Sequence, residues 1–220
     1  MWAIVTDNTI TKTLNNPKGL IIDDIQYSRK IFSLWSVSEK EAKGIYEVVF
    51  NNTNKKDEAY YNNTNQSFNF ADGVVTASFG SATGKLLEDR NEVWTQVEVD
   101  DGLAPDGTSA DDPKLDNNGD QVVTKGLKTQ KKEIIKQQAS GLLTPTDWYI
   151  IKAVDVESYS APANIITYRA NIRTASNDME TIIDNASDVD ALATLYQYVN
   201  TGTEEEPVME RPLGEFPEAV

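Results

Sequence analysis

Two residue types are missing altogether: the 220-residue chain contains no cysteine and no histidine. Without cysteine there are no disulfides, thiolate metal sites or thiol nucleophiles. Without histidine the chain lacks the serine–histidine–aspartate relay and the side chain that most often carries general acid–base work near neutral pH. Paired carboxylates or a lysine could still catalyse a reaction. We nevertheless expect no catalytic residues, no cofactor and no metal site, and we rank an enzyme third among the functional hypotheses.

Long apolar runs are also missing, since none approaches the roughly 18–20 residues of a membrane-spanning helix. The first seven residues, Met1 to Asp7, reach an acidic residue without the basic region that begins a signal peptide. We therefore expect no membrane partner, and a soluble protein that is made in a cytoplasm and kept there until assembly.

Basic residues are scarce: 20 Lys and Arg stand against 35 Asp and Glu, a net charge of -15. Nucleic acid is bound through clustered Lys and Arg. The chain has one such cluster, spaced as the solvated side of a helix: Lys125, Lys128, Lys131, Lys132 and Lys136. These counts argue against a nucleic-acid partner and favour a protein partner that carries basic patches.

The patterns present predict an α+β fold, with an N-terminal domain of mixed strands and short helices over residues 1–99. Apolar and β-branched runs predict strands at 2–5, 9–14 and 45–50, with turn residues between the first two. Residues 28–43 have helical spacing in two pieces, the second capped by Ser38 and ended by Gly44. Alternation predicts a hairpin over 68–79 and a strand over 93–99.

Composition changes sharply after residue 99. Residues 100–124 are rich in aspartate, glycine and proline and are predicted to be a mobile acidic linker. Residues 125–199 have helical periodicity and are predicted to form a small helical domain, with Pro162 opening one helix and a Ser187–Asp190 capping box opening the last. Residues 200–220 are predicted to be an extended acidic tail, whose order would indicate docking on a partner or a neighbouring subunit.

Four residues are candidates for partner binding. Tyr60 and Tyr61 lie in the polar, asparagine-rich stretch 51–67, where burial is least expected. Arg169 and Arg173 form an i, i+4 pair on a predicted amphipathic helix and are expected to be exposed, either as solvated charges or in contact with an acidic partner surface. By contrast, the tryptophans occur within apolar patterns and are assigned to the core: Trp2, Trp35, Trp94 and Trp148.

Two motif-like segments fail closer inspection. Asp116 to Asp120 alternates oxygen side chains as calcium loops do, but Gln121 and Leu127 occupy the positions that require glycine and glutamate. An Asn-Gly turn is favoured there. Gly80 to Lys85 has three residues between its glycines, one fewer than a phosphate-binding loop has.

Three stretches of the chain resemble small tailed-bacteriophage proteins linked to tail-fibre assembly, including uncharacterised virion proteins of marine phages. They are Leu142–Lys152 with Pro162 and Tyr168–Arg173, then Ile31–Ser36 with Gly44–Tyr46, and finally Met209–Pro217. The resemblance covers about half the chain and leaves residues 51–124 unmatched. It implies a protein that binds a phage tail, fibre or baseplate component, as an assembly factor or as a permanent part of the virion tail.

The leading hypothesis is therefore a non-catalytic tail or tail-fibre accessory protein that acts by protein–protein binding and is located in the virion. Self-association into a homo-oligomer stays open as a second kind of contact. The alternative is a receptor- or glycan-binding module of the tail, which exposed aromatic residues in the 51–70 loops would favour.

Overall fold

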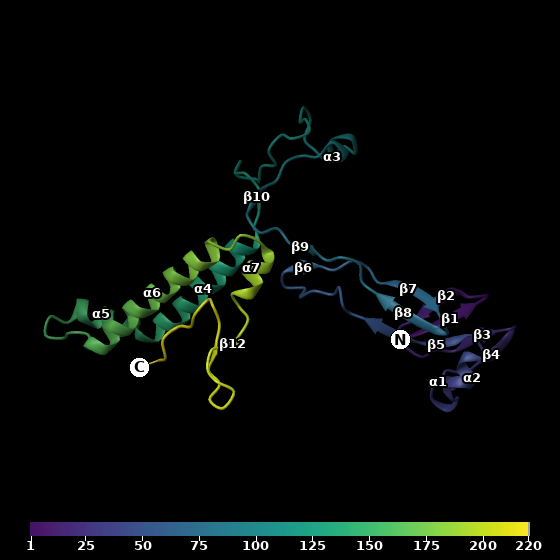
Figure 1. Ribbon diagram of the computed structural model, residues 1–220. Coiled ribbons are helices and arrows are strands. Elements are labelled where there is room, and N and C mark those ends of the chain that lie inside the picture. Colours follow the sequence, from purple (N-terminus) through teal and green to yellow (C-terminus); the bar gives the residue numbers. More distant parts are fainter. Residues whose placement is uncertain (220) are drawn as a thin grey trace. The chain divides into compact units, whose positions relative to one another are not determined.

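A computed structural model describes residues 1–219 and confirms the α+β class, with strands gathered in the N-terminal part and helices in the C-terminal part (Figure 1). The chain divides into two compact units, Met1–Thr83 and Gly84–Val220. The division lies at Thr83 rather than at the expected residue 99, and strand β9 (Thr83–Gly84) spans it.

The N-terminal unit is built from strands with two short helices inserted between them. In chain order these are β1 (Trp2–Thr6), β2 (Thr9–Leu14), β3 (Leu20–Ile22), β4 (Ile25–Tyr27), α1 (Ile31–Leu34), α2 (Val37–Glu41), β5 (Ile45–Asn51), β6 (Tyr61–Asn62), β7 (Ser67–Ala71) and β8 (Val74–Ser78).

Five of these strands form one sheet in the order β2-β1-β5-β8-β7. All neighbouring pairs are antiparallel except β5 and β8, which run parallel with Val48 opposite Val75. Three hairpins close through two-residue turns with positive φ at both positions, which is why short Asp, Asn and Gly residues occupy them. The turn pairs are Asp7–Asn8, Asp23–Asp24 and Asp72–Gly73.

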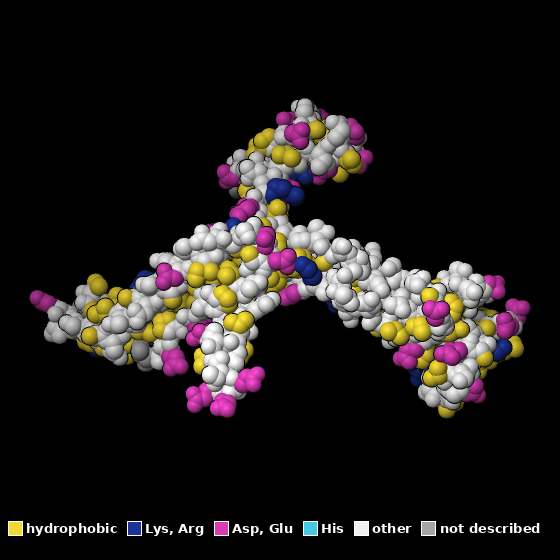
Figure 2. Space-filling model, in the orientation of Figure 1, with side chains coloured by type: hydrophobic (Ala, Val, Ile, Leu, Met, Phe, Trp, Pro, Cys, Tyr) yellow, Lys and Arg dark blue, Asp and Glu magenta, His cyan; other side chains and the backbone are white. Residues whose placement is uncertain are grey.

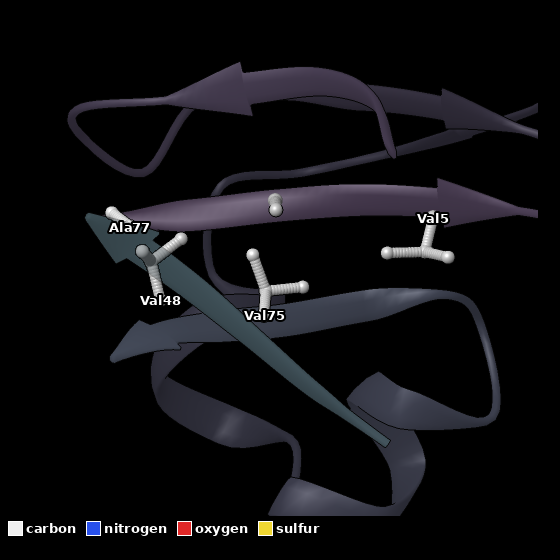
Figure 3. Packing of buried hydrophobic residues seen from close by; sticks show 5 residues of the cluster. Val5, Val48, Val75 and Ala77 are labelled. Carbon is white, nitrogen blue, oxygen red and sulfur yellow. The ribbon is translucent and has the colours of Figure 1, made fainter. Parts of the chain in front are cut away.

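Alternating side chains give this sheet two apolar faces. On one face Val5, Val48, Val75 and Ala77 converge from β1, β5 and β8 (Figure 3). On the other face lie Leu14, Leu20, Ile31, Phe32 and Ile45, contributed by strands and by α1. Aromatic rings close this second core, with Trp2 5.1 Å from Phe32 and Tyr27 5.2 Å from Trp35.

The C-terminal unit is mainly helical. Its elements are β10 (Arg90–Asn91), α3 (Gln96–Asp100), β11 (Val123–Thr124), α4 (Leu127–Leu143), the 3-10 turn η1 (Thr144–Thr146), α5 (Asp147–Asp155), α6 (Ala163–Asp184), α7 (Val189–Thr194), β12 (Val199–Asn200) and β13 (Met209–Glu210). Helices α4 and α6 lie side by side (Figure 1) and bury Ala139, Tyr168 and Ile172 between them. No helix of residues 1–219 is both long and apolar enough to cross a membrane.

Three helix starts or ends differ from the sequence prediction. The second short helix is capped by Ser36, not Ser38, through a capping box with Glu39. The last helix is capped by Asp188, whose carboxylate accepts from Ala191 N, rather than by a Ser187–Asp190 box, and it ends at Thr194. At both helix starts a hydroxyl or carboxylate within two residues competes for the same backbone donors, and the sequence does not rank these capping residues.

The predicted strand over 93–99 is wrong. Thr95 and Glu98 form a capping box that opens helix α3 at Gln96. Alternation suggested a strand because Val93, Val97 and Val99 are β-branched, but two satisfied backbone donors at the cap favour the helical turn.

The C-terminal tail is not simply extended. Strands β12 and β13 pair with Val199 opposite Glu210, and Leu213 N donates to Leu195 O at 3.1 Å. Leu213 is 1% exposed, and Phe216 packs against the α4–α6 core. The tail therefore docks on its own helical unit, a destination that the sequence analysis did not consider. Val220, which the expected tail included, lies outside the described residues.

Candidate functional site

Tyr60 and Tyr61 are not exposed, in contrast to the expectation. They are 6% and 7% exposed and belong to the core. Burial, and then the charge of Asp57, raises the pKa of Tyr60. Lys56 Nζ lies 4.3 Å from the centre of the Tyr61 ring, and at that distance its charge attracts the ring face.

The polar stretch around these tyrosines folds because its own side chains satisfy its backbone. Asn63 pairs twice with the Lys56 backbone, accepting from N and donating to O at 2.9 Å each. The Asp57 carbonyl accepts from the amides of both tyrosines at 3.0 and 2.9 Å. From composition alone such asparagines are expected to be solvated. In the structure Asn63 instead closes a loop that directs both tyrosines inward.

Arg169 is also buried, at 8% exposure, and one nitrogen of its guanidinium makes all the polar contacts of that group. Its Nη1 donates to Leu143 O at 2.9 Å and to Thr146 Oγ1 at 2.6 Å, and lies 2.7 Å from Asp147 Oδ1. These acceptors lie where α4 ends and α5 begins. Through this nitrogen Arg169 satisfies the carbonyl and carboxylate groups of this junction rather than meeting a partner.

Arg173 is exposed as expected, and it lines a polar groove of about 480 Å³ between α4 and α6. Its Nη1 donates to Arg169 O at 3.2 Å. Across the groove Lys136 pairs with Glu180 at 3.2 Å. The i, i+4 arginine pair is thus split into one structural and one solvent-facing residue, and both belong to the C-terminal unit, whereas Tyr60 and Tyr61 belong to the N-terminal unit.

The lysine cluster on α4 is largely neutralised by acids of its own unit. Lys128 contacts Glu88, Lys132 contacts Asp184 at 2.6 Å, and Lys125 contacts Glu133. Their charges are therefore compensated locally rather than combined into a basic surface.

The Asp116–Asp120 segment forms a turn with Gly119 at φ 86°. Asp116 Oδ1 accepts from the amides of Asn118 at 2.8 Å and Asp120 at 3.0 Å, and these backbone bonds lower the pKa of Asp116. Its carboxylate is thus used by the turn. In the described part of the chain no three acidic residues are grouped so as to hold a metal ion.

The acidic segment, defined as Arg90–Lys125, has the unusual property that none of its residues is buried. It contains nine Asp and Glu against three Lys and Arg. Its order comes from hydrogen bonds: β10 pairs with β11, Gln121 Nε2 donates to Glu92 O at 2.7 Å, and Lys114 reaches Glu98 at 2.6 Å. The bond from Lys114, with the Thr95 amide, lowers the pKa of Glu98 to about 2.

Helix α3 within this segment is capped at both ends. After the Thr95–Glu98 box at its start, Gly102 has φ 70°, its amide donates to Val99 O at 3.1 Å, and the Leu103 amide donates to Glu98 O at 2.9 Å. This is a Schellman motif, in which the residue after the glycine commonly contacts the residue at the position of Val97. Val97 and Leu103 are nevertheless 67% and 66% exposed. Figure 2 shows acidic and apolar side chains together over this region.

A second exposed apolar surface lies on α5, with Trp148, Ile151 and Val154 exposed by 50%, 59% and 80%. Trp148 was assigned to the core from its apolar neighbours, and that assignment is wrong. Trp2, Trp35 and Trp94 are partly buried. The sequence analysis missed both apolar surfaces as binding candidates. The Thr-x-x-Glu pattern and the following glycine could have revealed the helix that carries Val97.

Comparison with protein-family models, with curated proteins and with solved structures finds no match to this chain.

Proposed function

We propose that this chain is a non-catalytic accessory protein of a bacteriophage tail or tail fibre that acts by binding another protein of the tail, fibre or baseplate. The phage assignment depends on the sequence resemblance alone. The binding role has independent support from the surface, where apolar side chains are held in fixed positions without being buried.

The acidic segment is the observation that supports this role best. The 36 residues of this segment include no buried residue, so the segment has no hydrophobic core of its own. It nevertheless contains a helix, α3, that is capped at both ends. That helix presents Val97 and Leu103 to solvent among a surplus of carboxylates. Apolar anchors at the centre with charge around them are the composition of a protein-binding surface, and the partner that fits is a basic surface with an apolar recess.

The glycan-binding alternative depended on exposed aromatic residues in the 51–70 loops. Tyr60 and Tyr61 are buried, and Phe68 and Phe70 pack against the sheet core. This region therefore offers no aromatic platform for a sugar, and the protein-binding role is favoured.

The first test is quantitative mass spectrometry of purified particles of the phage that encodes the chain. A fixed stoichiometry with known tail proteins is the expected result for a virion component. Presence in infected lysate, bound to a fibre or baseplate protein but missing from particles, supports an assembly factor. Association with neither would refute the proposal.

A double variant then locates the contact. Val97→Ser with Leu103→Ser is expected to reduce incorporation or co-purification by at least about tenfold, because hot-spot residues typically contribute 2 kcal/mol or more. Ile21→Ser is the matched control, since Ile21 is 73% exposed in the other unit. Equal loss in both variants would show that the acidic segment is not the contact.

A further inference from the structure

The polar groove between α4 and α6 has two buried polar side chains in its wall. Arg169 and Ser176 both line it, and they are 8% and 7% exposed. Buried polar groups in folded proteins are normally hydrogen-bonded. Within residues 1–219 the Ser176 hydroxyl makes a single and long hydrogen bond, to Glu180 Oε1 at 3.4 Å. The wall of the groove therefore contains polar groups that the fold does not fully satisfy.

Arg169 provides the largest unused hydrogen-bonding capacity. Its Nη1 serves the junction between α4 and α5, where it contacts Leu143 O, Thr146 Oγ1 and Asp147 Oδ1. A guanidinium presents five N–H donors in a fixed fork, and Nη1 carries only two of them. In the described part of the chain the Nε and Nη2 donors make no hydrogen bond. Because Arg169 lines the groove, these donors are left for a ligand bound there.

Arg173 adds a second guanidinium one helical turn further along the same groove. Its Nη1 donates to Arg169 O at 3.2 Å, which holds the side chain against the turn that carries Arg169. Among the described residues it has no acidic partner. Two like charges at i and i+4 repel each other, and an anion bound beside both would remove that repulsion.

The charges that line the groove favour an anion of single charge. They are three bases, Lys136, Arg169 and Arg173, and two acids, Asp147 and Glu180. Asp147 pairs with Arg169 at 2.7 Å and Glu180 pairs with Lys136 at 3.2 Å. One positive charge is left over, in a chain that carries -15 as a whole. A carboxylate matches that charge, whereas a phosphate group brings about -1.5 to -2 and is repelled more strongly by the two acids.

We propose that this groove is a binding site for a carboxylate group, which is held by Arg173 and by the unused Nε and Nη2 donors of Arg169. Two parallel N–H donors of a guanidinium match the two oxygens of a carboxylate. The groove, at about 480 Å³, has the volume of a small-molecule site, so the carboxylate arrives with a short tail. Its source is either a free organic acid or the end of a peptide chain, and both present the same group.

NMR titration of the full chain with sodium acetate tests the site, with sodium chloride keeping the ionic strength constant. We expect the Nε–H signals of Arg169 and Arg173 to shift together. The expected dissociation constant is about 1–10 mM, because so small a ligand gains little binding energy. Inorganic phosphate at about pH 7 is expected to bind at least about threefold more weakly, because it brings more negative charge to the two acids.

A short peptide distinguishes the two sources of the carboxylate. Acetyl-glycyl-glycine presents a chain terminus, and its carboxamide lacks the charge. If the terminus of a peptide is the natural ligand, the acid binds at least about tenfold more tightly than acetate, because the backbone adds contacts along the groove. Equal affinities of the peptide and acetate identify a free organic acid. In both cases the carboxamide is expected not to bind.

Arg173→Gln removes the uncompensated charge at an exposed position and is expected to weaken acetate binding at least about tenfold. Arg29→Gln is the matched control, since Arg29 is an exposed arginine of the other unit. It should leave acetate binding unchanged. Urea unfolding of both variants verifies that neither loses its fold.

Three results would overturn the inference: groove signals that do not respond to acetate, phosphate that binds more tightly than acetate, or equal weakening by the two substitutions. The inference does not rest on the proposed function, because the purified chain is measured without any phage component. Failure here and failure of the particle experiment are therefore separate outcomes.

Discussion

Replacing Arg169 by methionine should lower the free energy of unfolding of the C-terminal helical unit. The substitution keeps an unbranched apolar stem and removes the guanidinium. Leu143 O, Thr146 Oγ1 and the Asp147 carboxylate then lose the donor that joins the end of α4 to the start of α5.

The magnitude follows from these contacts. A hydrogen bond to a charged group contributes about 1.5–3 kcal/mol, and Arg169 makes two such bonds to acceptors of the chain junction. The ion pair adds less than about 1 kcal/mol, because the Asp147 side chain is 48% exposed. Relief from burying a charge at 8% exposure offsets part of the sum. The expected loss in free energy of unfolding is about 2–3 kcal/mol.

Urea unfolding followed by far-ultraviolet circular dichroism measures this loss in the appropriate unit, because α4 to α7 provide most of the helical signal. Arg173→Met is the matched control. Arg173 is exposed and makes one long bond, so its loss should stay below about 0.5 kcal/mol. Equal stability of the two variants, or a loss below about 1 kcal/mol for Arg169→Met, would refute the structural role assigned to the buried arginine.

Three further outcomes are expected. Leu213→Ala should lower the free energy of unfolding by about 2–4 kcal/mol in the same urea assay, because the side chain is 1% exposed, whereas Val208→Ala at 49% should change it little; similar values would show that the tail is undocked. Gly126→Ala should lower the melting temperature, since its Cβ would lie 2.4 Å from backbone atoms, while Gly141→Ala meets nothing within 4 Å and should raise it slightly; the opposite order would contradict the close approach. In a carboxyl NMR titration Glu98 should titrate near pH 2 instead of its ordinary 4.5, because a lysine and the backbone donate to its charged form. The stability it contributes is therefore complete above about pH 4.5 and is lost as the pH falls towards 2, and a titration near 4.5 would contradict the bond.

Local turn and strand chemistry was predictable from the sequence. The Asp–Asn, Asp–Asp and Asp–Gly pairs mark the three hairpin turns because short side chains tolerate positive φ. The apolar runs that begin at residues 2, 45 and 74 become β1, β5 and β8. The helix after Pro162 begins where proline permits it, at Ala163.

The burial of residues in polar stretches was not predictable from the sequence. It depends on hydrogen-bond partners that are distant in the sequence, or on a loop conformation that the composition does not indicate. Tyr60 and Tyr61 are surrounded by asparagines, and only the Asn63–Lys56 pairing turns them inward. Arg169 has the same sequence spacing as Arg173. Its burial follows from Leu143 O and Thr146 Oγ1, two acceptors of the α4–α5 junction that lie 26 and 23 positions earlier in the chain.

For some apolar residues the opposite error occurred: burial was predicted and the side chains are exposed. Trp148 and Ile151 have core-like neighbours in the sequence, but no element of the described chain covers their side of α5. A periodicity argument assumes that every apolar stripe finds a partner within its own chain. The stripe on α5 breaks that assumption.

The parallel pairing of β5 with β8 has a consequence for how the N-terminal unit acquires its structure. The β1–β2 and β7–β8 hairpins are local and can close within microseconds. Strand β5 pairs with β1, where Glu47 lies opposite Trp2, and with β8, where Val48 lies opposite Val75. Each pairing closes a long loop, and the entropy cost of that closure comes before the new contacts can compensate it. The insertion of β5 is therefore the expected slow step. Until it occurs, each hairpin presents an unpaired apolar edge, and this interval is when the newly made chain is most prone to aggregate.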